Sequence, residues 1–262
     1  MAITLLVILG LAFGSFVNAF VWRIHEKKPW VNARSMCPNC QHELKAIDLI
    51  PILSWLWLRG VCRYCHKKIS LQYPIVEASV TILFLLSYIL WPSMLRGTEI
   101  IIFALWIFII TGLVALALYD LRYMILPTKL IYSLLGVAII MSALIVFSSG
   151  IYLVSFLNLA LGSIIGGGIF YVIYLISRGK WIGGGDVRLG FLLGLLAASP
   201  GRSLLVIYVA SIIGAAVSLA LISLKRLKRS SLIPFGPFLI SALFIVQFYG
   251  QHIMHWYRGL FL

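Results

Sequence analysis

Residues 100–119 of the chain read IIIFALWIFIITGLVALALY, a run of 20 residues without a charged side chain, and Asp120 follows it directly. A helix needs about 20 predominantly apolar residues to cross the hydrocarbon core of a bilayer. Of all 262 residues, 62% are hydrophobic and only 11% are charged, which is more apolar than a soluble globular domain of this size. The sequence therefore predicts an all-α polytopic membrane protein.

Further apolar segments lie on both sides of this run. We expect about eight transmembrane helices, over residues 2–22, 75–92, 99–119, 130–148, 152–176, 187–199, 203–224 and 233–250. The sixth segment is short and glycine-rich, so we expect it to be tilted, broken or partly buried in protein. No basic residue precedes the first segment and no small-residue cleavage site follows it. We interpret it as an uncleaved anchor with its N-terminus outside.

The net charge of +14 could indicate a nucleic-acid partner, but the positions of the basic residues argue against one. If eight crossings alternate, all of the 21 basic residues except Arg96, Arg202 and Arg258 fall on one side. Basic residues gather on the cytoplasmic side of membrane proteins. We therefore expect no nucleic-acid partner and a basic cytoplasmic face that meets the head groups of the lipid bilayer.

A polar and basic segment between the first two crossings carries all four cysteines, Cys37, Cys40, Cys62 and Cys65, as two C-x-x-C pairs with 21 residues between them. Two such pairs can present four thiolates to one tetrahedral Zn²⁺, and a cytoplasmic location keeps thiols reduced. Redox-active pairs and inert thiols are the alternatives. His42 and His66 are spare ligand candidates. We predict a small zinc-ribbon-like cytoplasmic loop that is held together by the metal.

The predicted organisation has three parts: the first transmembrane helix at 1–22, the cysteine module at 23–73, and a multi-helix membrane core at 74–262. Within the module, residues 50–58 (IPILSWLWL) are apolar enough to lie against the membrane interface, where tryptophan is favoured. Small residues at four-residue spacing, Gly162 with Gly166 and Gly190 with Gly194, predict close packing of helices in the core.

Asp120 and Asp186 are the only acidic residues in the last 163 residues, and each lies at the edge of an apolar segment. The alternating topology places both at the cytoplasmic side. Carboxylates at a membrane boundary are costly and indicate function. Two close carboxylates share one proton, so one can act as base and the other as acid in hydrolysing a peptide bond. The alternative is that both acids are ordinary helix-end residues, so that Asp186 caps a helix and Asp120 pairs with Arg122 or another basic residue.

The residues around these acids offer further candidates. Gly183, Gly184 and Gly185 precede Asp186 and lack side chains, so an extended substrate could approach there, and unusual backbone angles are permitted. Pro127 predicts the start of the helix that follows Asp120. Glu77 is a third acidic candidate, which could line the site or pair with a basic residue.

The chain resembles the type IV prepilin peptidases, a family of GxGD-type membrane aspartyl proteases that process the prepilins of bacterial type IV pili and type II secretion systems. The resemblance is carried by GSFVN at 14–18, SMCPNC at 35–40, DLIPILSWL at 48–56, LRGVCRYC at 58–65, YPIVE at 73–77, the region of Asp120, and GGGD at 183–186.

This resemblance implies that Asp120 and Asp186 are catalytic. It further implies that the enzyme cuts prepilins or pseudopilins after a glycine that ends a basic leader. The same enzyme would then methylate the new N-terminus with S-adenosylmethionine, in the bacterial cytoplasmic (inner) membrane. Two positions depart from the family pattern: Thr128 follows Pro127 where an acid is frequent, and Arg188 stands where lysine is common. A peptidase without methylation and an ion-coupled transporter are the alternative functions.

Overall fold

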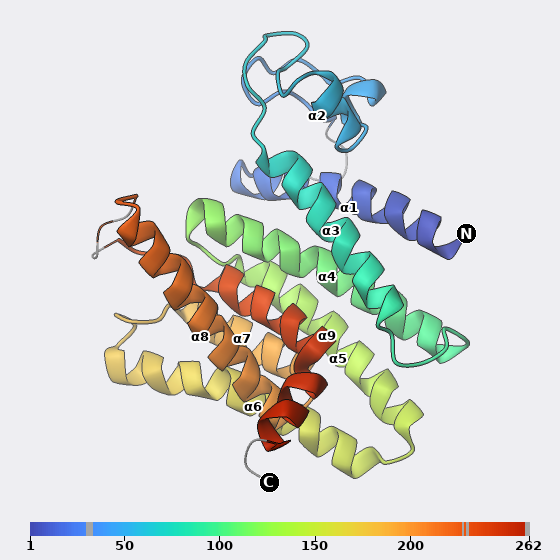
Figure 1. Cartoon of the computed structure of the whole chain (residues 1–262), viewed down its shortest axis with the longest axis vertical. Coiled ribbons are helices and arrows are strands. Elements are labelled where there is room, and N and C mark those ends of the chain that lie inside the picture. The colour runs from blue at the N-terminus through green and yellow to red at the C-terminus, as the bar shows by residue number, and fades with distance from the viewer. Residues whose placement is uncertain (30–33, 227, 229–230, 260–262) are drawn as a thin grey trace. The chain divides into compact units, whose positions relative to one another are not determined.

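The computed structural model describes residues 1–29, 34–226, 228 and 231–259 (Figure 1). These residues form helices joined by short connections, and two isolated β-bridges are the strand-like pairings among them. The chain divides into two compact units. The first contains Met1–Pro92 together with Ile110–Ala115, and the second contains Ser93–Ile109 and Leu116–Leu262.

The first unit contains two long helices, α1 (Ala2–His25) and α3 (Gln72–Ile89), and the cysteine module lies between them in sequence with η1 (Ala46–Leu49) and α2 (Leu53–Trp57). Two glycines let α1 and α3 approach closely. A Cβ built on Gly10 would lie 2.6 Å from the Cα of Thr81, and one on Gly14 would lie 2.5 Å from the Cα of Glu77. This pair has the same four-residue spacing that indicated close packing elsewhere.

The second unit is built from long helices that are connected by short turns. They are α4 (Thr98–Tyr123, with residues 110–115 in the first unit), α5 (Thr128–Ser149), α6 (Tyr152–Ser177), α7 (Gly184–Ala197), α8 (Pro200–Ser223) and α9 (Gly236–Gly259). Pro127 is the N-cap of α5, as predicted. Pro200 and the Ser199 hydroxyl, which accepts from the backbone N–H of Arg202, begin α8 in the usual manner of a capped helix.

Seven of the described helices, all except α2 and α7, are long and apolar enough to cross a membrane. They correspond to seven of the predicted crossings. Helix α7 has 14 residues and would be about 21 Å long, shorter than the hydrocarbon core. Most of its apolar residues are buried. It therefore fits the expectation of a short segment that is partly buried in protein.

The two predicted glycine pairs pack against each other. A Cβ built on Gly166 would lie 2.7 Å from the carbonyl oxygen of Gly190, and one on Gly162 would lie 2.9 Å from that of Gly194. The register is that of antiparallel helices, because the residue number rises on α6 as it falls on α7. Helix α7 therefore returns along α6, with close backbone contacts at Gly190 and Gly194.

Candidate functional site

Asp120 lies in the last turn of α4 and is only 5% exposed. The C-terminal end of a helix repels negative charge. Helix α9 compensates for this, because the backbone N–H of Gly236, its first residue, donates to Oδ2 of Asp120 at 3.1 Å. The carboxylate thus lies against the positive end of a second helix, 116 residues further along the chain.

Gly236 is a site residue that the sequence analysis missed. A Cβ at this position would lie 2.6 Å from Oδ2 of Asp120, so the contact requires glycine. The available signal is the segment 234–237, Pro-Phe-Gly-Pro, at the start of the last long apolar segment. Prolines on both sides of a glycine mark a helix start with a special backbone approach.

Asp186 lies in the first turn of α7, three residues after the N-cap Gly183. It is half-buried, and the backbone N–H of Gly183 interacts with its carboxylate. Burial raises the pKa of Asp186, and the contact with Gly183 opposes this shift. The proposed capping role is therefore present in the form of half a capping box. Such a contact leaves the second carboxylate oxygen available for chemistry.

The structure brings the two aspartates to one place around Leu126, in the turn between α4 and α5. A Cβ built on Gly185 would lie 3.0 Å from the Cβ of Leu126, and one on Gly236 would lie 3.5 Å from its Cδ2. Leu126 is buried between these two glycines. The two carboxylates are close enough for their charges to repel each other. Each acid also lies at the N-terminal end of a helix, which favours the anionic form needed in a base.

The glycines before Asp186 do not use the unusual backbone angles that glycine permits. Gly183 has an extended backbone with φ −76° and ψ 151°. No left-handed φ occurs at 183–185. Gly185 packs tightly on Leu126, whereas Gly183 is exposed. The close approach seen at Gly185 is an internal contact with Leu126, and the approach of a substrate to these glycines stays a prediction.

The two departures from the family pattern are partners in one contact. Nη1 of Arg188, in the first half of α7, donates to the hydroxyl of Thr128, the first residue of α5. A Cβ built on Gly184 would lie 3.7 Å from Nη2 of Arg188. The contact therefore joins the starts of α5 and α7 next to the turn that carries Leu126.

The alternatives for the other charged candidates are resolved by their contacts. Asp120 makes no ion pair with Arg122, whose guanidinium instead lies 5.9 Å from the ring centroid of Tyr123. Glu77 is buried in the first unit, where its Oε2 accepts from the backbone N–H of Ile52 at 2.7 Å and its carboxylate also interacts with Ser15. Glu77 therefore anchors a loop of the cysteine module instead of pairing with a basic residue.

The four cysteines converge as predicted. The sulfur atoms of Cys37, Cys40, Cys62 and Cys65 all lie within 4.8 Å of one another, close enough to hold a metal ion. The Sγ atoms of Cys37 and Cys65 are 3.9 Å apart, which matches the edge of a tetrahedron of sulfur ligands at about 2.3 Å from a metal. Neither histidine belongs to this cluster.

Two equivalent turns present these thiols. In the first, the N–H of Cys37 donates to the carbonyl of His42, and the N–H of Gln41 donates to the carbonyl of Cys37. The second turn repeats the pattern 25 positions later, at Cys62 and its neighbours. Burial opposes ionisation of the Cys37 thiol, but the backbone N–H groups of Cys40 and Asn39 lower its pKa to about 7. A thiol poised to ionise is the form that binds a metal.

Asp48 joins the two halves of the module. Its carboxylate accepts from Nε of Arg63 at 2.8 Å and from the hydroxyl of Tyr64 at 3.1 Å. Burial would raise its pKa, but these contacts, with the Lys45 amide, lower it. Arg63 and Tyr64 are the two central residues of the second C-x-x-C pair, so Asp48 holds that pair against η1.

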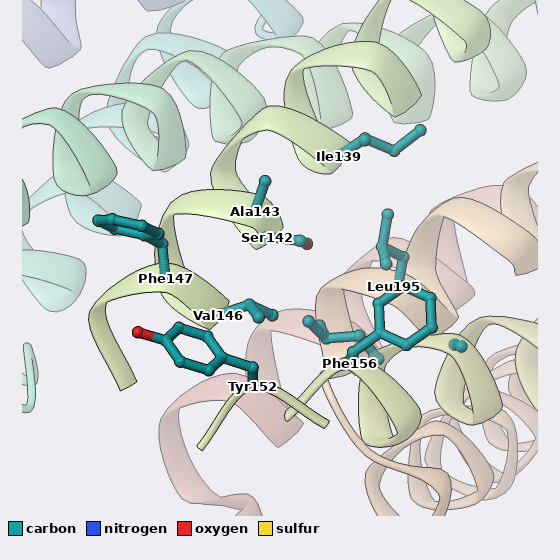
Figure 2. A pocket seen from close by; sticks show the side chains of 10 residues that line it. Ile139, Ser142, Ala143, Val146, Phe147, Tyr152, Phe156 and Leu195 are labelled. Carbon is teal, nitrogen blue, oxygen red and sulfur yellow. The ribbon is translucent and has the colours of Figure 1, made fainter. Parts of the chain in front are cut away.

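A cavity of about 390 Å³ lies between α5, α6 and α7, away from the aspartates (Figure 2). Its walls include Phe147, Phe156 and Leu195, and the hydroxyls of Ser142 and Tyr152 are its polar groups. Ser142 lies 14 residues along α5 from Thr128, or about 21 Å. The cavity therefore takes no part in the chemistry of the two acids.

Comparisons with known proteins match both halves of the chain. The model of the bacterial peptidase A24 N-terminal domain matches residues 8–91, and that of the type IV leader peptidase family matches residues 107–219. Both aspartates lie in the second match, and Gly236 lies beyond it. No solved structure matches the chain.

Several curated relatives carry one name, prepilin leader peptidase/N-methyltransferase. The protein from Aeromonas hydrophila is 35% identical over 236 residues, which cover 87% of this chain and 76% of the relative. The protein from Bacillus subtilis (strain 168) is 31% identical over 264 residues and covers 97% of each chain. Similarity at this level over nearly the full length, together with the convergent aspartates, shows that the chain belongs to the type IV leader peptidase family.

Proposed function

We propose that this chain removes the leader from type IV prepilins or pseudopilins and then methylates the new N-terminal residue. Family membership supports both activities, since the relatives are named for them. The observation that carries the peptidase is the convergence of Asp120 and Asp186 around Leu126, with Asp120 against the first residue of α9 and Asp186 in the first turn of α7. The aspartates serve as catalytic residues in this proposal.

The chemistry follows from a proton shared by the two carboxylates. The ionised aspartate removes a proton from water, and the water oxygen attacks the carbonyl carbon of the scissile peptide. The protonated aspartate supplies the hydrogen that the leaving amine needs as the C–N bond breaks. The proton taken from water restores the pair, so no covalent intermediate forms. The N–H of Gly236 fixes the position of Asp120 throughout.

The glycine run is the proposed place for the substrate backbone. Gly183 is exposed, and neither it nor Gly184 has a side chain that would keep an extended peptide away from Asp186. Gly185 serves the site by packing on Leu126. The substrate helix must unwind locally before its peptide bond can be cut. The glycines leave room for such an extended segment, because they have no side chains.

Substitution of each aspartate tests the peptidase. Asp120→Asn and Asp186→Asn keep the shape of the side chain and remove its charge, so we expect both variants to insert into membranes and to leave a model prepilin uncut. Mass spectrometry of the prepilin after incubation is the measurement. Full cleavage by either variant would refute the mechanism, and loss of insertion would be seen in the membrane fraction.

Methyl transfer depends on family membership. S-adenosylmethionine carries a sulfonium, an amine and a carboxylate, and the cavity in Figure 2 has almost only hydrocarbon walls, so the two do not fit. No residue of this cavity is therefore assigned to the methyl donor. The mature pilin should gain about 14 Da when one methyl group replaces one hydrogen. A product that is cut but never gains this mass would show that the chain is a peptidase without methyltransferase activity.

Zinc is the proposed ion of the four-cysteine cluster. The all-sulfur ligand set, the tetrahedral spacing and the short module support it. We expect about one zinc ion per chain in the wild-type protein and none after Cys37→Ser with Cys62→Ser, as measured by metal analysis. An unchanged metal content in this double variant would refute the proposed zinc site.

The proposed location is the bacterial cytoplasmic membrane, with the cysteine module and the aspartates on the cytoplasmic side. The charge distribution supports this orientation, since Arg96, Arg202 and Arg258 are the basic residues left for the other side. Prepilins and pseudopilins are the proposed partners within the bilayer, and the seven long apolar helices fit that setting.

A further inference from the structure

The cysteine module leaves a group of large apolar side chains uncovered. Leu53, Leu56 and Trp57 on α2 are 60%, 58% and 78% exposed, and Ile47 and Ile50 beside them are also exposed. A module surrounded only by water would bury such residues. Contiguous apolar surface that stays exposed marks a binding face. These five residues are called the apolar face below.

The apolar face belongs to an ordered helix. Residues 53, 56 and 57 have the three- and four-residue spacing that places side chains on one side of a helix. Trp55 points the other way: its Nε1 donates to the carbonyl of Ile69 at 3.2 Å, and its ring covers Gly60. Trp55 therefore fixes α2 to the rest of the module, whereas Trp57 stays exposed.

The module also ties α2 to a helix that can cross the membrane. Ile52, the N-cap of α2, has a left-handed φ of 59°, which is unfavourable for a β-branched residue. Its N–H donates to the buried Glu77 carboxylate in α3 at 2.7 Å. Helix α3 begins at Gln72, next to the exposed Leu71. The apolar face is thus attached, through one rigid contact, near the start of a spanning helix.

The charge around the apolar face is positive. Of the three acidic residues in the described part of 23–73, Glu43 is paired with Arg34 and Asp48 with Arg63, and Glu26 is the C-cap of α1. Four further basic residues of the same module are exposed: Lys45 before η1, Arg59 after α2, and Lys67 and Lys68 in the second turn. Apolar side chains within a basic surround are typical of segments that lie in the interface of anionic bilayers.

We propose that the apolar face is a membrane-docking surface, with Leu53, Leu56 and Trp57 at the boundary between head groups and acyl chains of anionic lipids. Protein–protein interfaces are depleted of lysine, and tryptophan favours the membrane interface, so lipid fits this surface better than a protein partner. Docking would hold the module against the bilayer in addition to its covalent links to α1 and α3.

A photo-crosslinker at the apolar face tests this proposal on the full-length chain. A benzophenone amino acid replaces Trp57, and the protein is placed in nanodiscs of phosphatidylglycerol or of phosphatidylcholine. We expect a phospholipid adduct in the mass spectrum, more abundant with phosphatidylglycerol. The same probe at Asn39, an exposed position in the first cysteine turn, is the control and should give almost none. An adduct with a second copy or with added model prepilin would overturn the proposal, as would no adduct.

A second measurement uses the native Trp57 as its probe. The fluorescence of Trp57 is the difference between the wild type and Trp57→Phe. In nanodiscs with brominated acyl chains, this fluorescence should be quenched. Acrylamide, a quencher dissolved in water, should have little effect on it. The reverse pattern would place Trp57 in water and end the proposal. Lys67→Gln with Lys68→Gln should abolish the preference of the crosslinked adduct for phosphatidylglycerol. A preference that persists would refute the electrostatic part.

Discussion

Single residues at the aspartate site join parts of the chain that are distant in sequence. Gly236 reaches back to Asp120, and Arg188 reaches back to Thr128. Leu126 is packed between Gly185 and Gly236. The sequence alone named the acids as candidates, because carboxylates are unusual at a membrane edge, and named the glycine run because it precedes Asp186. It could not reveal Gly236 as a donor, since that contact exists only after distant helices have packed.

Gly236→Ala should impair catalysis while the acids themselves are unchanged. The added methyl group would occupy space now filled by Oδ2 of Asp120, 2.6 Å away. We expect a roughly 100-fold loss in kcat for leader cleavage, typical of a displaced catalytic group, with KM nearly constant. Gly136→Ala is the matched control, since a Cβ there meets nothing within 4 Å. Wild-type kcat in Gly236→Ala would show that the contact is dispensable.

Thr128→Val should weaken the link between α5 and α7. It removes the hydroxyl that accepts from Arg188 and keeps the size of the side chain. We expect kcat to fall roughly 10-fold through misplacement of the first turn of α7. Adding Arg188→Met should cost little more, because both changes break one contact.

Thr128→Ser keeps an acceptor and should remain near wild type in the same cleavage assay. Ser133→Ala, which removes an exposed hydroxyl bonded only within α5, serves as the second control. Additive losses in Thr128→Val with Arg188→Met would mean that the two residues act independently.

Helices α6 and α7 show what sequence can and cannot establish about an element. Their glycine spacing predicted close packing, and the two pairs prove to be each other's partners. Helix bounds followed from apolar runs and, for α5, from Pro127. The shortness of α7 was visible, but its return along α6 depends on tertiary contact. Ser163 adds to it by donating to the carbonyl of Phe191 at 3.0 Å.

Gly166→Ala should destabilise the second unit. A Cβ there would meet the backbone of α7 at 2.7 Å, and backbone cannot move aside as a flexible side chain can. We expect a loss of about 1–3 kcal/mol, the usual cost of overpacking, seen as a lowered Tm of the purified protein in detergent. Gly168→Ala, on the same helix, has no Cβ contact under 4.0 Å and should not lower Tm. Equal Tm values for both variants would contradict the packing.

For the whole molecule, the all-α membrane architecture followed from composition, and the orientation was predicted from charge. The two compact units were harder to foresee. Residues 110–115 of α4 belong with the first unit although the rest of that helix belongs with the second. No change of composition marks such a division, because one apolar helix serves both. The three-part division at 22/23 and 73/74 stays a prediction.

Topology reporters should reproduce the charge-based orientation. Alkaline phosphatase, which is active outside the cytoplasm, should be active when fused after Gly97, in the connection between α3 and α4. Green fluorescent protein, which fluoresces inside, should fluoresce when fused after Lys225, at the end of α8. We expect the same fluorescence after Gly179, between α6 and α7. Active phosphatase at residue 179 would place Asp186 on the wrong side for prepilin processing.

The hydrogen bond from Gly236 to Asp120 also has a consequence for biosynthesis. A ribosome makes Asp120 and Asp186 long before it makes the residue on which Asp120 rests. Between codons 186 and 236 the nascent enzyme therefore carries both acids while one of them is unsupported. A premature stop anywhere before codon 236 should yield an inserted but idle chain, so that peptide-bond cleavage is withheld until the last helix has been threaded into the bilayer.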